Sequence, residues 1–123
     1  MIALWVALAG GLGAVARFVV DGLVRTRASA AFPVGTVIVN VSGSFTLGLV
    51  SGLVLAHAAP DGLRLVVGTG FLGGYTTFST ASFETVRLVE QRRVDLALLN
   101  AAGTLLGTVC VAAAGLWLGF RVT

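Results

Sequence analysis

Hydroxyl and amide side chains are concentrated in two apolar segments of this sequence, where they could donate hydrogen bonds to an ion. After Gly74, five serine or threonine residues fall within eight positions, at Thr76, Thr77, Ser79, Thr80 and Ser82. The other segment carries Thr36, Asn40 and Ser44 at four-residue spacing, which places them on one face of a helix. Hydroxyl and amide donors favour an anion, whereas backbone carbonyls freed from a helix favour a cation. Both segments therefore indicate ion recognition.

Asn40 and Arg17 are the polar residues expected deepest within apolar surroundings, and each has two possible roles. Asn40 either makes an interhelical hydrogen bond that fixes packing, or it lines a pore as a donor; its spacing favours neither role. Arg17 is either an anchor that reaches the membrane surface or a fixed positive charge that attracts an anion. No acidic residue lies in the middle of an apolar stretch, which argues against proton-coupled export of cations.

Glycines dominate the stretch that precedes the hydroxyl cluster. Gly68, Gly70, Gly73 and Gly74 fall within seven residues, and glycine and threonine are poor helix formers. We therefore predict a helix break at Gly73 and Gly74, near the middle of an uncharged run. A break there is tolerated only where it is buried in protein or faces water or an ion. The first three of these glycines also match a dinucleotide-binding pattern, but that pattern requires a preceding strand in a soluble domain.

Composition shows what kind of elements must position these residues. The chain has 123 residues, of which 57% are hydrophobic and only 11% charged, whereas a soluble domain has about 25% charged residues. Charged residues fall in short groups, and a helix that crosses a bilayer needs roughly 20 apolar residues. The sequence therefore predicts one integral membrane domain, residues 1–123, with four transmembrane helices at about 2–24, 33–57, 65–88 and 96–120.

Several glycines recur at four-residue spacing, which lets membrane helices approach one another closely. We interpret most of these pairs as packing contacts: Gly48 and Gly52, Gly70 and Gly74, Gly103 and Gly107, and Gly115 and Gly119.

Three stretches resemble motifs of the fluoride channel family known as Fluc or CrcB. Residues 10–18, GGLGAVARF, are similar to the family's glycine-rich opening and arginine. Residues 35–45, GTVIVNVSGSF, are similar to its G-T-x-x-x-N-x-x-G-S-F motif, and residues 73–80, GGYTTFST, to its G-G-x-T-T-F-S-T motif. The three stretches occur in the family's order, and the resemblance covers essentially the whole chain.

The resemblance implies an all-α membrane protein that forms a dimer of four-helix subunits in antiparallel, dual-topology orientation. Two narrow pores run along the dimer interface. A sodium ion at the centre is structural and not transported, and its ligands would be the backbone carbonyls of Gly73 and Thr76 in each subunit.

The resemblance also implies which side chains meet the anion. Asn40 corresponds to the family's pore asparagine, and Arg17 to the arginine near the pore entrance. Phe78 supplies an aromatic edge with positive quadrupole character, and the hydroxyls of Ser79 and Thr80 can donate to fluoride.

One position departs from the family pattern. Family members carry a second phenylalanine three residues after the first, but Ala81 occupies that position here. We expect a homodimer, with a heterodimer containing a paralogous subunit as the alternative. The loops after the first and third predicted helices are richer in arginine than the other side, and this bias is consistent with the heterodimer.

The expected function is passive fluoride efflux across the cell (plasma) membrane, which lowers the toxicity of cytoplasmic fluoride. A non-conducting or partner-dependent channel subunit is the main alternative, and a small cation or drug exporter is a weaker one. Neither an enzyme nor a nucleic-acid-binding protein is expected, since no nucleophile–base pair and no cluster of metal ligands is visible in the sequence.

Overall fold

The computed structural model describes residues 1–28 and 31–122, and within them the chain consists of helices and the turns that join them. The all-helical prediction is therefore confirmed for this part of the chain. In order, the elements are α1 (Ile2–Arg27), α2 (Val34–Leu55), α3 (Asp61–Leu63), η1 (Arg64–Leu72), α4 (Gly73–Tyr75), α5 (Phe78–Glu90), α6 (Val94–Leu98), η2 (Leu99–Gly103) and α7 (Thr104–Arg121).

Three of the described helices are long and apolar enough to cross a membrane. They are α1, α2 and the continuous helix α6–η2–α7, whose mean hydropathies are 1.9, 1.8 and 1.8. Their lengths of 26, 22 and 28 residues match the roughly 20 residues that a bilayer requires. The polypeptide between α2 and α6 takes a different form, because α3, η1 and α4 make one helical stretch and α5 makes another.

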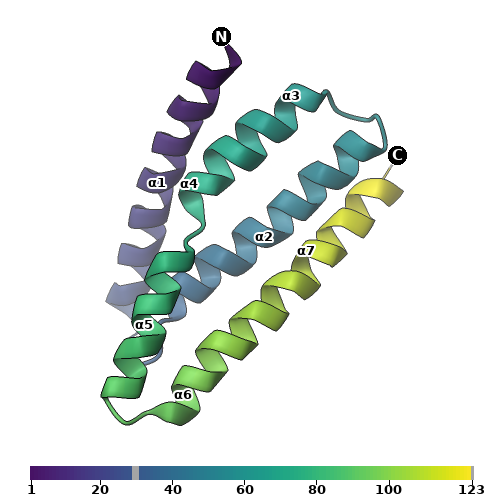
Figure 1. Ribbon diagram of the computed structural model, residues 1–123. Coiled ribbons are helices and arrows are strands. Elements are labelled where there is room, and N and C mark those ends of the chain that lie inside the picture. Colours follow the sequence, from purple (N-terminus) through teal and green to yellow (C-terminus); the bar gives the residue numbers. More distant parts are fainter. Residues whose placement is uncertain (29–30, 123) are drawn as a thin grey trace.

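The third helical region is interrupted at Thr76 and Thr77. Both residues have extended backbone, with φ and ψ of −79° and 158° at Thr76 and of −149° and 122° at Thr77. The sequence predicts the break at Gly73 and Gly74, but these two glycines lie within the helical turn α4. The extended residues are instead β-branched threonines, which suit extended backbone better than glycine does. Figure 1 shows α5 displaced sideways from the end of α4.

Close glycine contacts hold the long helices together. α2 packs along α7, where a Cβ on Gly48 or Gly52 would collide with the α7 backbone, and one on Gly115 or Gly119 with the α2 backbone. α1 packs against η1 and α4 in the same way, through Gly13, Gly70 and Gly74.

The pair Gly103 and Gly107 behaves differently from the other predicted pairs. No atom lies within 4 Å of a Cβ built on Gly107, and the Gly103 position meets only Leu99 of its own helix. The packing prediction is therefore wrong for this pair within the described part of the subunit, because the face that it occupies is not covered by another helix.

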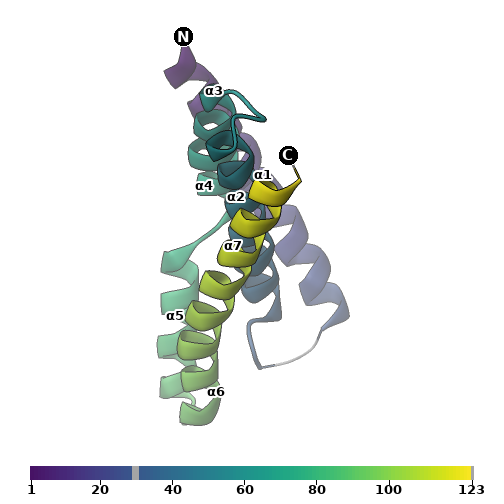
Figure 2. The ribbon, with the colours of Figure 1, turned by 90° about the vertical axis from the view of Figure 1, so that its right-hand side faces the viewer.

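Both termini lie at one end of the bundle, as Figures 1 and 2 show from two directions. The turn between α2 and α3 lies at the same end, and the turn between α5 and α6 lies at the opposite end. Among the described residues the buried apolar core is small and consists of Val39, Val50, Val54, Leu72, Leu88 and Ala97. Many large apolar side chains face outward, which is typical of a protein surrounded by lipid or by another subunit.

Candidate functional site

The interruption in the third helical region is held by the side chain of Asn40. Its Nδ2 donates to the carbonyl of Thr77, and its Oδ1 accepts from the N–H of Thr77, both at 2.8 Å. One amide therefore pairs with both polar groups of a residue that has left the helix. Asn40 is only 8% exposed, so water contributes little to satisfying these groups.

Thr77 also begins the next helix. Its Oγ1 accepts from the N–H of Thr80 at 3.2 Å, which is the bond of a helix N-cap. The same hydroxyl donates to Oγ1 of Thr80 at 3.1 Å. The Thr80 hydroxyl accepts this bond and keeps its own proton for another acceptor. The start of α5 is therefore fixed by side chains of the hydroxyl cluster.

These bonds release two backbone carbonyls from their usual partners. In a continuous helix, the Gly73 carbonyl would accept from the N–H of Thr77, and the Thr76 carbonyl from the N–H of Thr80. In this structure the first N–H donates to Asn40, and the second donates to the Thr77 hydroxyl. The carbonyls of Gly73 and Thr76 thus lose the N–H partners that a continuous helix would give them.

Arg17 lies on α1 beside the same interruption. A hollow of about 280 Å³ is lined by Arg17, Thr77 and Thr80, together with residues of α1 and α2. Arg17 is half-buried, and it forms no hydrogen bond or ion pair with any other described residue. The hollow therefore places the unpaired Arg17 near a hydroxyl proton of Thr80, two groups that can attract an anion. The Asp21 carboxylate also lines the hollow, and its charge is offset by the ion pair with Arg25.

A larger groove of about 630 Å³ lies on the other side of the interruption. Asn40, Gly73, Thr76 and Phe78 line it, along with residues of α5, η2 and α7. Phe78 is 88% exposed, so its ring has almost no contact within the subunit. The groove is open at the surface of the subunit.

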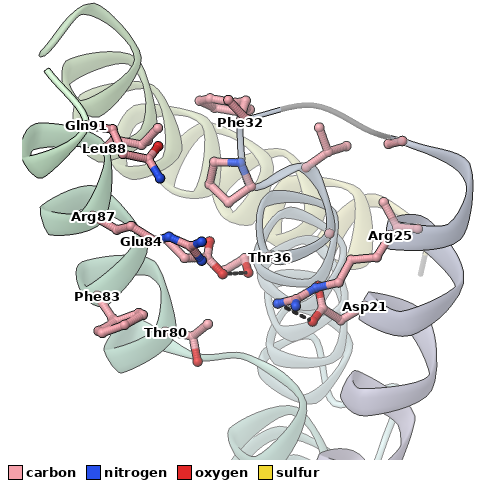
Figure 3. A pocket seen from close by; sticks show the side chains of 16 residues that line it. Asp21, Arg25, Phe32, Thr36, Thr80, Phe83, Glu84, Arg87, Leu88 and Gln91 are labelled. Atoms are coloured by element: carbon pink, nitrogen blue, oxygen red, sulfur yellow. Dashed lines mark hydrogen bonds and ion pairs between the residues drawn. The ribbon is translucent and has the colours of Figure 1, made fainter. Parts of the chain in front are cut away.

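The charged end of the bundle holds a third hollow of about 580 Å³, drawn in Figure 3. In this view Thr36 and Glu84 face each other from α2 and α5, and the Thr36 hydroxyl donates to Glu84 Oε1 at 2.8 Å. On the α1 side, Arg25 pairs with Asp21 at 3.1 Å. The Thr36–Glu84 bond joins α5 to α2 at this end.

Most of the predicted site residues meet at the interruption. Asn40, Thr76 and Phe78 share the groove, while Arg17 and Thr80 share the smaller hollow. Ser79 is exposed, and its hydroxyl lies 3.4 Å from that of Thr77.

Asn100 is not among the site residues predicted from the sequence, yet it is only 2% exposed and contacts α5. A lone amide within an apolar run is the signal that could have identified this residue.

The fold and the site define a multi-pass membrane protein with an interrupted helical region, at which polar side chains and an arginine converge. A model of the family described as "CrcB-like protein, Camphor Resistance (CrcB)" matches residues 4–118. The chain belongs to this family, and the resemblance seen in the motifs is confirmed.

Curated relatives extend this result over almost the full length of the chain. One from Leifsonia xyli, named "Fluoride-specific ion channel FluC 1", is 56% identical over 97% of this chain and 87% of its own length. Another from Cutibacterium acnes, named "Fluoride-specific ion channel FluC 2", is 46% identical over 99% of this chain and 100% of its own length. A third from Geobacillus kaustophilus, also named "Fluoride-specific ion channel FluC 1", is 43% identical over 97% of this chain and 95% of its own length.

Proposed function

We propose that the chain is a fluoride channel that lets the ion leave the cell passively and so lowers fluoride toxicity. One observation carries the proposal: the backbone interruption at Thr76 and Thr77, which Asn40 clamps with two hydrogen bonds of 2.8 Å. The interruption collects polar donors between long apolar helices. The relatives named as fluoride channels support the choice of ion.

The surroundings suit fluoride because this ion is small and strongly hydrated. Donors have to replace its water, and a fixed positive charge has to offset its own charge. Arg17 supplies an unpaired charge, and Thr80 and Ser79 supply hydroxyls. The second Nδ2 proton of Asn40 is a further donor, since the two bonds to Thr77 use one proton and the oxygen.

The functional unit in this proposal is an antiparallel homodimer. A subunit with the four helices expected from the sequence does not enclose a pore readily, and the groove beside Phe78 lies open along α5 and α7. A second copy in the opposite orientation covers this groove and brings its own ring to the interface. Pores then run between the subunits. A paralogous subunit in the place of the second copy is the alternative, and Ala81, which lines the groove without a ring, favours that alternative.

A structural sodium ion belongs to the same proposal. The residues fit such an ion, because the N–H partners of the Gly73 and Thr76 carbonyls are diverted to side chains. These carbonyls from each subunit would hold the cation, and backbone oxygens are suitable ligands for it. When bound, the ion neutralises the carbonyl dipoles at the interruption. Asn40 and Thr77 keep the carbonyls free of the helix.

Fluoride efflux from liposomes that contain the purified chain tests the function directly. We expect fluoride efflux without chloride efflux when sodium is present, and a loss of efflux when sodium is replaced by a larger cation. Chloride efflux at a similar rate would overturn the assignment of a fluoride channel. A well-folded chain without efflux would contradict the homodimer, and restored activity after co-reconstitution with a paralogous subunit would then identify the heterodimer.

Phe78→Ala should reduce fluoride efflux about tenfold or more without reducing the amount of dimer. The Phe78 ring is 88% exposed and therefore adds little to the stability of the subunit, but in the proposed dimer it faces the ion. The measurement is liposome efflux normalised to the amount of dimer. Phe83→Ala is the matched control, because Phe83 is an exposed phenylalanine on another face of α5. Equal losses in both variants would show that the aromatic edge of Phe78 has no particular role.

A further inference from the structure

Asn100 joins the last helix to α5. It lies on η2, and its Nδ2 donates to Oγ1 of Thr85 at 2.8 Å and to the carbonyl of Ala81 at 3.4 Å. The backbone at η2 is π-helical, a form that often marks functional positions within long helices. The amide is only 2% exposed, so it belongs to the interior of the subunit.

The local hydrogen bonds determine which way the Asn100 amide is turned. The hydroxyl of Thr85 donates its only proton to the Ala81 carbonyl at 2.8 Å. Oγ1 of Thr85 is therefore left as an acceptor, and the group that faces it must be an N–H. Asn100 thus presents its nitrogen to α5. Its Oδ1 is buried, and it has no hydrogen-bond partner among the described residues.

Few apolar contacts hold α5 in place. Leu88 is the buried residue of this helix among those that the structure describes, while Phe78, Phe83, Val86 and Val89 are exposed. Polar bonds tie α5 to its neighbours instead: Glu84 accepts from Thr36 of α2, and Thr85 accepts from Asn100 of η2. A helix with so little buried apolar surface depends on such bonds for its position.

We infer that Asn100 is a positioning residue, whose bond to Thr85 and Ala81 holds α5 where the channel needs it. Phe78 and Thr80, which face the ion in the proposed function, both lie on α5, the helix to which the Asn100 amide is hydrogen-bonded. Asn100 also lines the groove beside Phe78, but its nitrogen is directed to α5. This inference rests on the proposed function and extends it to a residue on the last helix.

Replacement of Asn100 should affect the stability of the fold and the conduction of fluoride differently. A buried acceptor without a partner is unfavourable, so the unpaired Oδ1 detracts from the stability of the fold. Leucine has a similar branched shape and no polar atom. In Asn100→Leu the Thr85 hydroxyl still donates to the Ala81 carbonyl, and no new unpaired group arises. If Asn100 served only to stabilise the fold, leucine at this position would stabilise it at least as well.

The test compares fluoride efflux with the thermal stability of the dimer in detergent. We expect Asn100→Leu to lower efflux about tenfold or more while the dimer stays at least as stable as the wild type. Thr85→Val removes the other end of the same bond, and the double variant should be no worse than either single one. Thr46→Val is the matched control with no expected effect, because the Thr46 hydroxyl donates only to the Ser42 carbonyl of its own helix. Wild-type efflux in Asn100→Leu, or losses that multiply in the double variant, would overturn the inference.

A distance measurement keeps the inference testable if Asn100→Leu gives no dimer, or if the wild-type chain does not conduct. Spin labels on Cys110 of α7 and on Val89→Cys of α5 report how firmly these two exposed positions are held relative to each other. Labelled chains are diluted with unlabelled ones to isolate the distance within a subunit. Thr85→Val should broaden the distance distribution, whereas Thr46→Val should not. An unchanged distribution in Thr85→Val would overturn the positioning role, independently of whether fluoride passes.

Discussion

Asn40→Leu should abolish fluoride efflux while the chain still inserts into the membrane. The variant leaves both the N–H and the carbonyl of Thr77 without their 2.8 Å partners inside the bundle. An unsatisfied buried polar group costs about 1–3 kcal/mol, so the pair amounts to roughly 2–6 kcal/mol. The extended backbone then has to rearrange, most simply by returning the Thr77 N–H to the Gly73 carbonyl. That change would remove the free carbonyl and shift the start of α5.

The measurement is liposome efflux, accompanied by size-exclusion chromatography to follow the dimer. Asn40→Asp separates the two halves of the clamp, because an ionised carboxylate still accepts from the Thr77 N–H but cannot donate to the Thr77 carbonyl. We expect efflux to be greatly reduced in this variant as well, with less damage to the fold. Thr46→Val, on the same helix, should conduct normally. Normal efflux in Asn40→Leu would show that neither the clamp nor a pore amide at this position is needed.

The two possible roles of Asn40 illustrate how far the sequence could lead. Its position within an apolar helix predicted that the amide makes a hydrogen bond, either to another helix or to an ion in a pore. Its spacing with Thr36 and Ser44 predicted that the three residues share one face of a helix. The partner could not be predicted, because it is the backbone of a residue 37 positions later in the chain. Backbone groups carry no signature in the sequence. The structure shows that the amide makes an interhelical bond, and that the bond is to the interrupted segment itself.

The location of the interruption was misjudged for a related reason. Glycine's low helix propensity favoured a break at Gly73 and Gly74, but propensity is a weak guide once tertiary contacts are available. Gly74 is helical where α4 meets α1, because its missing Cβ makes room for the backbone of Gly10. The hydrogen bonds that stabilise extended backbone are found three residues later, at Thr77.

The spacing of glycines likewise does not reveal which tertiary contacts they make. The pairs Gly48–Gly52 and Gly103–Gly107 have identical spacing in apolar helices, yet the first is pressed against a neighbouring helix and the second meets none. Spacing determines which residues share a face of a helix. The arrangement of the helices in space decides whether that face is covered. For the same reason, the sequence did not predict a role for Asn100, because only the fold shows that this residue lies beside α5.

Gly13→Ala should destabilise the subunit strongly, whereas Gly11→Ala, two residues earlier on α1, should not. A Cβ on Gly13 would collide with the Phe71 carbonyl and would lie 2.9 Å from the Tyr75 nitrogen, and both obstacles are backbone atoms. Such atoms cannot move without shifting the whole stretch of η1 and α4. Overpacking of this kind typically costs about 1–3 kcal/mol. The shift also reaches the interruption that follows directly after Tyr75, so efflux should fall together with stability.

The contrast with Gly11 makes this prediction specific to the contact between α1 and η1. Nothing lies within 4 Å of a Cβ built on Gly11, and alanine is favoured over glycine in a helix by about 0.8–1.0 kcal/mol. Gly11→Ala should therefore match or exceed the wild type in thermal stability and conduct normally. If both variants are equally stable, the contact is looser than the structure shows. If Gly13→Ala lowers stability but leaves efflux unchanged, the interruption holds its geometry independently of α1, and the bonds made by Asn40 and Thr77 are sufficient to maintain it.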